Sequence, residues 1–245
     1  MDWIRTTHLQ APPKGEAHLW QADYLNWADR LVELKSHLSS EEVDRSDRFL
    51  REGDRKRYVF AHGLLRRVLA TCCRCEPAVV GFGCGGHGKP YLAHPSVEGE
   101  VIEFNISHSG DIVLIGVAQG CPLGVDVERL SRKVEFKGLS ERYFSLEEAE
   151  TIQRLPQGQG SRTFFETWVC KEAFIKAVGE GLTMPLNSFS VHLEDGRTTV
   201  GPSAEKENLS LEPPWFLDRF EVASDYVGAV AMPVEKVRLT GFLLQ

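Results

Sequence analysis

The chain has 245 residues and a net charge of −7, and its composition is 42% hydrophobic and 26% charged. These proportions are ordinary for a globular protein and exclude a disordered chain, a collagen-like repeat and a disulfide-held mini-protein. No apolar run approaches the roughly 20 residues that a membrane span needs, and the N-terminus lacks the pattern of a secretory signal. We therefore expect a cytoplasmic protein with no membrane partner, and the acidic balance argues against nucleic acid as a partner.

Positive charge is concentrated in one part of this acidic chain. Residues 45–67 contain eight lysines and arginines against three acidic residues, so this window carries +5 and the rest of the chain carries −12. A local basic patch on an acidic protein suits a small polyanion or an acidic partner surface. For any single arginine, a solvated helix face is the simpler interpretation.

The first half of the chain is expected to hold two helices, a loop and a strand. A Ser-x-x-Glu capping box predicts a helix over about residues 39–50, and apolar residues at helical spacing predict a second over about 55–71. The glycine-rich residues 81–90 are expected to form a loop, and the apolar run IVLIGVA at 112–118 predicts a buried strand. Residues 18–20 are only a weak strand candidate.

The second half begins with GVDVE at residues 124–128, whose alternation predicts a strand. A second capping box predicts a helix from about residue 145 that ends before a proline. The QGQGS sequence that follows is expected to be a loop, and an apolar helix is expected over about 162–178. The last part predicts a surface loop at 201–214 and short strands at 189–193, 220–223, 226–232 and 237–244.

The two halves show a faint internal similarity. GDIVLIGVA, which ends at Ala118, resembles SDYVGAVAM, which ends at Met232, and YVFAHGLLRRVLA resembles WVCKEAFIKAVGE. The strand pair is offset by 114 residues and the helix pair by about 110. A repeat of this kind indicates two similar α+β halves.

Two acidic residues of the GVDVE sequence are the first candidates for a chemical role. Because side chains alternate along a strand, Asp126 and Glu128 are expected on the same face. Neighbouring carboxylates repel one another unless positive charge lies between them. Two carboxylates together with substrate phosphate oxygens are typical of a magnesium site. The alternative is an edge strand that presents its polar face to water.

The predicted helix over 162–178 carries a second charged group. Glu172 and Lys176 are four residues apart and therefore share a helix face, with Lys171 beside them. An intrahelical salt bridge is the simple explanation. The helix is apolar nearly all round, however, which favours a polar cavity or a partner as the environment of these charges.

Two glycine-containing segments bear polar residues that suit phosphate. The sequence from Gly83 to Lys89 fits G-x-x-x-x-G-K, but Pro90 follows and no helix is expected there, so a Walker P-loop is rejected. A backbone loop with one lysine for phosphate remains open. Ser107 and His108 lack the G-x-S-x-G context of a hydrolase, which leaves phosphate binding or a structural turn as their roles.

The cysteines raise the alternative of a zinc site. Cys72, Cys75, Cys84 and His87 have ligand-like spacing, C-x2-C-x8-C-x2-H. Two of the six cysteines follow directly on the predicted helix over 55–71, and His87 lies in the glycine loop. Reduced, inert thiols are the ordinary alternative in a cytosolic protein.

Taken together, GKP, FNISHSG, GVDVE, RYFSLEE and WVCKEAFIKAVGEGL, in this order and spacing, resemble the surfactin-synthetase-type 4′-phosphopantetheinyl transferases. The resemblance covers roughly residues 40–235. It implies a pseudo-duplicated α+β monomer in which each half is a small antiparallel sheet packed with helices. Residues 1–119 would form the adenine and 3′-phosphate side, residues 120–245 the metal and pyrophosphate side, and the active site would lie in the cleft between the halves.

The resemblance implies an enzyme that moves 4′-phosphopantetheine from coenzyme A to a serine of an apo acyl or peptidyl carrier protein and releases 3′,5′-ADP. Coenzyme A would be the co-substrate, and Mg²⁺, or alternatively Mn²⁺, the cofactor. Carrier proteins of fatty-acid, polyketide and peptide synthesis are all candidate partners. The alternative is a coenzyme A-binding regulatory protein without transfer activity, which would be expected to lack the metal carboxylates or Glu172.

By the same resemblance, the metal ligands would be Asp126, Glu128 and Glu172. The catalytic residues would be Asp126, Glu172 as the general base, and Lys176 on phosphate oxygens. The residues that bind coenzyme A would be Arg45, Arg57, His87, Lys89, Pro90, Ser107, His108, Lys171 and Lys176. Glu148 matches a family carboxylate near the site, but we expect it to act chiefly as a helix cap. A basic segment with an exposed aromatic, namely Arg132, Lys133, Phe136 and Lys137, is a candidate for carrier docking.

Overall fold

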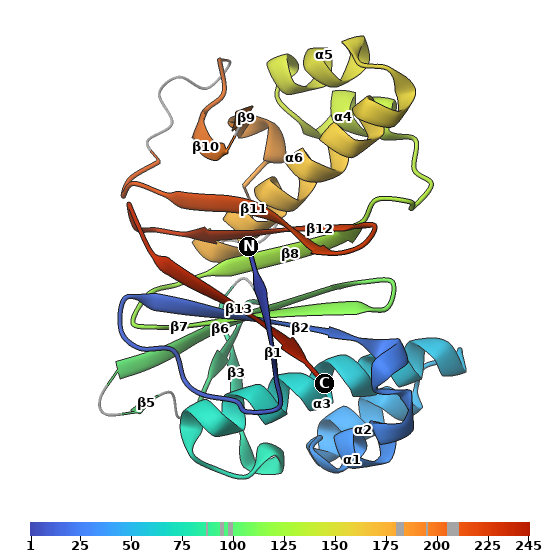
Figure 1. Cartoon of the computed structure of the whole chain (residues 1–245), viewed down its shortest axis with the longest axis vertical. Coiled ribbons are helices and arrows are strands. Elements are labelled where there is room, and N and C mark those ends of the chain that lie inside the picture. The colour runs from blue at the N-terminus through green and yellow to red at the C-terminus, as the bar shows by residue number, and fades with distance from the viewer. Residues whose placement is uncertain (87, 94–95, 98–99, 180–183, 195, 205–210) are drawn as a thin grey trace. The chain divides into compact units, whose positions relative to one another are not determined.

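The fold is described from a computed structural model, which covers the chain except residues 87, 94–95, 98–99, 180–183, 195 and 205–210. The chain divides into two compact units (Figure 1). Unit 1 consists of Met1–Cys121 and Arg238–Gln245, and unit 2 consists of Pro122–Val237. Among the described residues, no helix has the length and apolar character needed to cross a membrane.

Unit 1 is built on a six-stranded sheet in the order β1-β13-β2-β7-β6-β5. The β2–β7–β6 part is antiparallel, whereas β13 lies parallel to both β1 and β2. The strands of unit 1 are β1 (Trp3–Thr6), β2 (Glu16–Asp23), β3 (Phe82–Cys84), β4 (Pro90–Leu92), β5 (Ser96–Val97), β6 (Glu100–Ser109), β7 (Ile112–Gln119) and β13 (Arg238–Leu244). Its helices are α1 (Leu31–Ser36), α2 (Ser40–Asp47) and α3 (Glu52–Cys73), with short 3-10 turns at Tyr24–Asn26, Ala28–Arg30 and Pro77–Val79.

The core of unit 1 lies between this sheet and α3. Alternate residues of three adjacent strands, represented by Trp20, Phe104 and Ile115, belong to one buried cluster with Leu64 and Leu69 of α3. The period of two along the strands and the helical spacing on α3 therefore meet in a single apolar layer.

Unit 2 repeats this plan with a smaller sheet. Its three antiparallel strands are ordered β11-β12-β8, and the 22-residue helix α6 packs on them. A separate antiparallel pair is formed by β9 and β10. The elements are β8 (Gly124–Arg129), α4 (Phe136–Tyr143), α5 (Leu146–Arg154), α6 (Gln157–Val178), a 3-10 turn at Leu186–Ser188, β9 (Phe189–Glu194), β10 (Arg197–Pro202), β11 (Phe216–Ala223) and β12 (Tyr226–Met232).

The predicted duplication is confirmed by the topology. Each unit contains a strand, then a 22-residue helix, then an antiparallel hairpin, and the strand orders β2-β7-β6 and β8-β12-β11 correspond. The similar sequences lie on equivalent elements, β7 with β12 and α3 with α6. Even a turn contact repeats, because the Tyr24 amide donates to the Asp111 carbonyl and the Leu130 amide to the Asp225 carbonyl, each at 2.8 Å. The predicted α+β class is therefore correct.

The units differ from the expected halves at the C-terminus. Residues 238–245 lie in unit 1, because β13 pairs with β1 and β2 and places Phe242 and Leu244 in the core of that unit. The other division, after Cys121, lies two residues beyond the expected one.

Both capping boxes predicted from the sequence are present, and several element bounds shift. The Ser39 hydroxyl accepts from the Glu42 amide at 3.3 Å, and the Glu42 carboxylate accepts from the Ser39 amide at 3.1 Å. Helix α2 nevertheless ends at Asp47, short of the expected residue 50. The expected surface loop also starts later, because β10 continues to Pro202.

Two segments expected to be loops have regular structure. Within residues 81–90, β3 and the start of β4 form a short antiparallel pair in which Phe82 faces Leu92, and both residues join the core of unit 1. The QGQGS sequence forms the first turns of α6. There Gly160 packs so closely that an added Cβ would lie 3.0 Å from the Phe136 ring, so this glycine serves packing inside a helix.

Candidate active site

Helix α6 approaches strand β8 closely at Gly124. A Cβ at this position would lie 2.0 Å from the Ala173 carbonyl oxygen and 2.4 Å from the Ala177 amide nitrogen. Only glycine permits that contact without displacing the helix. The close approach sets the spacing between the charged residues of α6 and those of β8.

The ammonium group of Lys176 bonds to the strand across this contact. Its Nζ donates to Asp126 Oδ1 at 2.6 Å and to the Val125 carbonyl at 3.2 Å. The Asp126 residue is only 5% exposed, so this ion pair lies in a largely water-excluded environment. A buried carboxylate held by a charged donor is a strong, directional contact.

Glu172 lies one turn before Lys176 on the same helix and is half-buried. Burial raises the pKa of the Glu172 carboxyl, the nearby Asp126 and Glu128 carboxylates raise it further, and Lys176 opposes them. The carboxylates of Asp126 and Glu128 therefore disfavour the charged form of Glu172.

Glu128 faces a basic residue of its own unit. Its carboxylate pairs with the Arg132 guanidinium at 3.1 Å. Among the residues that the structure describes, no group of three or more histidine, cysteine, aspartate or glutamate side chains is arranged to hold a metal ion. The donor chemistry of the three predicted ligands nevertheless fits Mg²⁺, which prefers carboxylate oxygens, and a divalent cation would relieve their repulsion.

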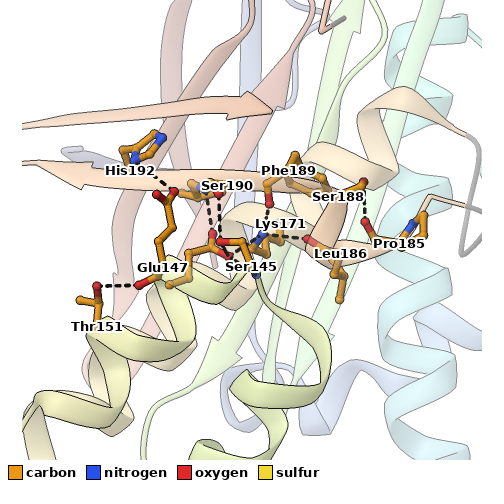
Figure 2. A network of polar contacts seen from close by, with 12 residues as sticks. Ser145, Glu147, Thr151, Lys171, Pro185, Leu186, Ser188, Phe189, Ser190 and His192 are labelled. Atoms are coloured by element: carbon orange, nitrogen blue, oxygen red, sulfur yellow. Dashed lines mark hydrogen bonds and ion pairs between the residues drawn. The ribbon is translucent and has the colours of Figure 1, made fainter. Parts of the chain in front are cut away.

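Lys171 does not have the role predicted for it. It is fully buried, and its Nζ contacts Glu148 Oε2 at 2.8 Å and donates to the Leu186 carbonyl at 2.8 Å and to the Phe189 carbonyl (Figure 2). An ammonium group has three donors, and all three are used inside the unit. We therefore assign Lys171 to the fold of unit 2 and not to coenzyme A.

Glu148 completes this buried network and acts as the predicted cap. Its carboxylate accepts from the Ser145 amide at 2.9 Å and from the Val191 amide at 2.7 Å. The Ser190 hydroxyl donates to the Ser145 hydroxyl at 2.9 Å. The network joins α5, α6 and β9, so Glu148 and Lys171 together connect three elements of unit 2.

The predicted phosphate ligands Arg57 and Arg45 lie in unit 1. The Arg57 guanidinium donates to Asp111 Oδ1 at 2.9 and 3.2 Å, and it lies 5.8 Å from the centre of the Tyr24 ring. The Arg45 guanidinium lies 5.7 Å from the Tyr58 ring centre. Both arginines are exposed, so their positive charge is accessible to an anion.

Ser107 and His108 belong to strand β6, which continues through the expected turn to Ser109. Because they are successive strand residues, their side chains project to opposite faces of the sheet. Ser107 is 8% exposed, whereas His108 is exposed. The sequence motif thus offers two faces of β6 rather than one joint pair of donors.

Lys89 follows the turn between β3 and β4, and Pro90 begins β4. The Lys89 carbonyl accepts from the Gly85 amide at 2.9 Å, which fixes this turn. Burial lowers the pKa of Lys89, and the Glu103 carboxylate opposes that effect. His87, which was also predicted to bind coenzyme A, lies outside the described residues.

The candidate docking segment loses its aromatic residue. Phe136 is only 3% exposed, because it begins α4 and packs in the core of unit 2. Arg132 is paired with Glu128, and Lys137 donates to the Gln153 carbonyl at 3.4 Å. The prediction of an exposed aromatic docking loop is therefore wrong.

The cysteines of the zinc-like pattern do not share an environment. Cys72 is buried, and burial raises the pKa of its thiol to about 12, whereas Cys75 and Cys84 are exposed. A thiol with so high a pKa is inert at neutral pH. The fourth member of the pattern, His87, lies outside the described residues.

Two residues that position this chemistry were not singled out from the sequence. Gly124 admits α6, and its only signal is a glycine at the start of an otherwise β-branched and acidic strand. Asp111 holds Arg57, and its signal is an aspartate in the turn after SHSG. Neither partner helix is near in sequence, so the contacts themselves could not be inferred from local pattern.

Comparison with known proteins agrees with this duplicated scaffold. The 4′-phosphopantetheinyl transferase superfamily model matches residues 122–231, and the model for the N-terminal part of 4′-phosphopantetheinyl transferases matches residues 19–119. The chain is 32% identical over 234 residues to the 4′-phosphopantetheinyl transferase HetI of Nostoc sp., covering 94% of each chain. It is 35% identical over 198 residues to the 4′-phosphopantetheinyl transferase ffp of Bacillus subtilis, covering 80% of this chain and 83% of the relative.

Among solved structures, holo-[acyl-carrier-protein] synthase from Neisseria meningitidis is similar with a TM-score of 0.37 and 17% identity, over 46% of this chain and 97% of the other. The matches over both units show that the chain belongs to the 4′-phosphopantetheinyl transferase superfamily. The family resemblance carried by the sequence motifs is confirmed, and the chain is a transferase.

Proposed function

We propose that this protein transfers 4′-phosphopantetheine from coenzyme A to a serine hydroxyl of an apo carrier protein and releases 3′,5′-ADP. The observation that carries the proposal is the group on unit 2 in which Lys176 bonds to Asp126 while Glu172 and Glu128 add negative charge beside them. Carboxylates and a lysine in one environment suit a reaction at a pyrophosphate. The relatives named as transferases support the same conclusion.

Asp126, Glu128 and Glu172 are the residues that would hold Mg²⁺. When bound, the cation supplies neutralisation of the negative charge that develops on the leaving phosphate. Lys176 donates to phosphate oxygens, and its present bond to Asp126 keeps its ammonium group at that place. Glu172 takes the proton of the attacking serine hydroxyl, as its partly buried carboxylate suits a general base.

Each unit, taken by itself, contains candidate residues for coenzyme A. Arg57, Arg45 and His108 of unit 1 offer exposed cationic or donor groups for the 3′-phosphate, and Lys89 and the turn before β4 suit the adenylate end. Ser107 offers a hydroxyl on the other face of β6. Lys176 of unit 2 serves the pyrophosphate.

A coenzyme A-binding regulator without transfer activity is the less favoured alternative. Such a protein needs phosphate ligands but has no use for the Asp126 and Glu128 carboxylates that raise the pKa of the half-buried Glu172. The retention of Asp126, Glu128 and Glu172 in one environment therefore favours the transferase.

The decisive experiment incubates the protein with coenzyme A, Mg²⁺ and an apo acyl carrier protein and measures the mass of the carrier. We expect an addition of about 340 Da, the mass of the transferred group, at a serine. Coenzyme A binding without any addition to a panel of apo acyl and peptidyl carriers would instead support the regulator.

A further inference from the structure

We propose that the segment Arg48–Arg51, which connects α2 to α3, is the docking surface for an acidic face of the carrier protein. This inference rests on the proposed function, because it assigns a surface to the second substrate of that reaction. We call these four residues, Arg48, Phe49, Leu50 and Arg51, the connector patch.

The connector patch presents apolar side chains to solvent. Leu50 is 102% exposed, more than any other large hydrophobic residue among those described, and Phe49 beside it is 36% exposed. Burying a fully exposed leucine against a partner removes its apolar surface from water, which favours association. A small polyanion, by contrast, gains nothing from Leu50.

The connector patch carries two exposed arginines, Arg48 and Arg51, that form no ion pair with the described part of the chain. The nearest acidic residues are already paired, Asp47 with Lys35 at 3.3 Å and Glu52 with Lys56 at 2.7 Å. Three exposed arginines around Leu50 have no ion pair with the described part of the chain, namely Arg45, Arg48 and Arg51. Exposed cations of this kind attract an acidic surface and accelerate its approach.

The position of the patch suits a partner that must approach coenzyme A. The connector joins two helices that carry the proposed coenzyme A ligands, Arg45 on α2 and Arg57 on α3. The segment first considered for docking, around Phe136, is apolar only in the buried core. The segment around Phe136 has exposed basic residues but no exposed aromatic residue, whereas the connector patch has exposed apolar and basic residues together.

The test measures binding of fluorescein-labelled apo acyl carrier protein by anisotropy, without coenzyme A, to the wild type and to variants of the patch. We expect Leu50→Ala and the double variant Arg48→Glu/Arg51→Glu each to raise the Kd by about tenfold or more. Added salt should weaken the wild type but have little effect on the charge-reversed variant.

Leu146 provides a matched control, because it is 62% exposed but is followed by the acidic Glu147. Leu146→Ala should leave the Kd unchanged. Equal Kd values for the wild type and both patch variants, or no carrier binding by the wild type, would overturn the docking assignment. So would a dimer in sedimentation velocity that Leu50→Ala dissociates, because a second copy would then cover the patch.

Mass measurement of the carrier in the same samples, after coenzyme A and Mg²⁺ are added, separates this proposal from the one it rests on. Binding that depends on Leu50 without any mass increase would sustain the docking surface and refute the transfer reaction. If the transfer rate at a subsaturating carrier concentration were the same in the wild type and in both patch variants, the transfer reaction would be sustained and the docking surface refuted.

Discussion

The two units use the same scaffold for different purposes, and the difference is clearest where a strand meets the long helix. The internal repeat makes Ile115 of β7 equivalent to Ala229 of β12. On the neighbouring strand, Ile115 pairs with Trp20 of β2 in unit 1, and Ala229 pairs with Asp126 of β8 in unit 2. Trp20 is 1% exposed and belongs to the core. Asp126 occupies the same place in the repeat, where it bonds to a lysine of the helix.

The neighbouring positions follow the same rule. Two residues further along the strand, Ala22 of unit 1 is equivalent to Glu128 of unit 2. Two residues earlier, His18 of unit 1 is equivalent to Gly124 of unit 2. In unit 1, Trp20 and Ala22 belong to the apolar core that includes α3. Unit 2 brings the helix backbone onto Gly124 and places the Asp126–Lys176 ion pair beside it, so the duplicated fold has charged residues where its sister unit has apolar core.

The sharpest way to break this comparison is Asp126→Ala. Loss of the carboxylate removes the partner of Lys176 and one proposed metal ligand, so transfer to the carrier should fall by roughly a hundredfold or more. Circular dichroism should show the fold intact, because the residue adds nothing to the apolar core. Near-normal rates with Mg²⁺ would show that the strand position of unit 2 is structural, like that of unit 1.

The equivalent change in unit 1, Trp20→Ala, should have the opposite signature. Truncating this buried indole leaves a cavity between the sheet and α3, and we expect a loss of about 3–5 kcal/mol in the free energy of unfolding. Chemical denaturation measures it. At a temperature where the variant is folded, transfer per folded molecule should be close to that of the wild type, and a selective loss of turnover would contradict the assignment of unit 1's strand to the core.

A third test concerns the buried ion pair of unit 2 between Lys171 and Glu148. Lys171→Met leaves the Glu148 carboxylate buried without its cation, which should cost about 3–5 kcal/mol of stability. Lys171→Met/Glu148→Gln removes both charges and should recover part of that loss in the same denaturation assay. If the double variant were no more stable than the single, Glu148 would not depend on Lys171 for its charge balance.

Local pattern predicted those parts of the molecule that depend on near neighbours in sequence. The Ser39–Glu42 capping box follows from a spacing of three residues, and the structure contains it. The shared face of Asp126 and Glu128 follows from a spacing of two residues on a strand, and Asp126 bonds to Lys176 of α6. What failed depends on distant contacts. The burial of Lys171 is decided by carbonyl groups at Leu186 and Phe189, which no helical pattern contains.

The same reason accounts for the chain end and for the docking segment. Residues of β13 were expected with their sequence neighbours, yet they pair with β2, more than 200 positions earlier. Phe136 was expected to be exposed because its neighbours are basic, but it packs against the distant Phe164 of α6, with ring centres 6.4 Å apart. Pairing and packing across such separations are selected by the whole fold and not by the segment.

The smallest expected effect uses a feature that the units share. The equivalent turn aspartates each hold an arginine, Asp111 binding Arg57 and Asp225 binding Arg129. If Arg57 contacts the 3′-phosphate, Arg57→Ala should weaken coenzyme A binding by about 1.5–3 kcal/mol but leave 3′-dephospho-coenzyme A almost unaffected, since only the former has the charged group. Calorimetric titration with both ligands measures the difference.

Arg129→Ala is the matched control and should reduce the binding of neither ligand, because in unit 2 we assign the arginine to the turn alone. An equal loss for both ligands in Arg57→Ala would mean that the Arg57–Asp111 pair serves only to join the turn to α3, as the Arg129–Asp225 pair joins a turn to β8.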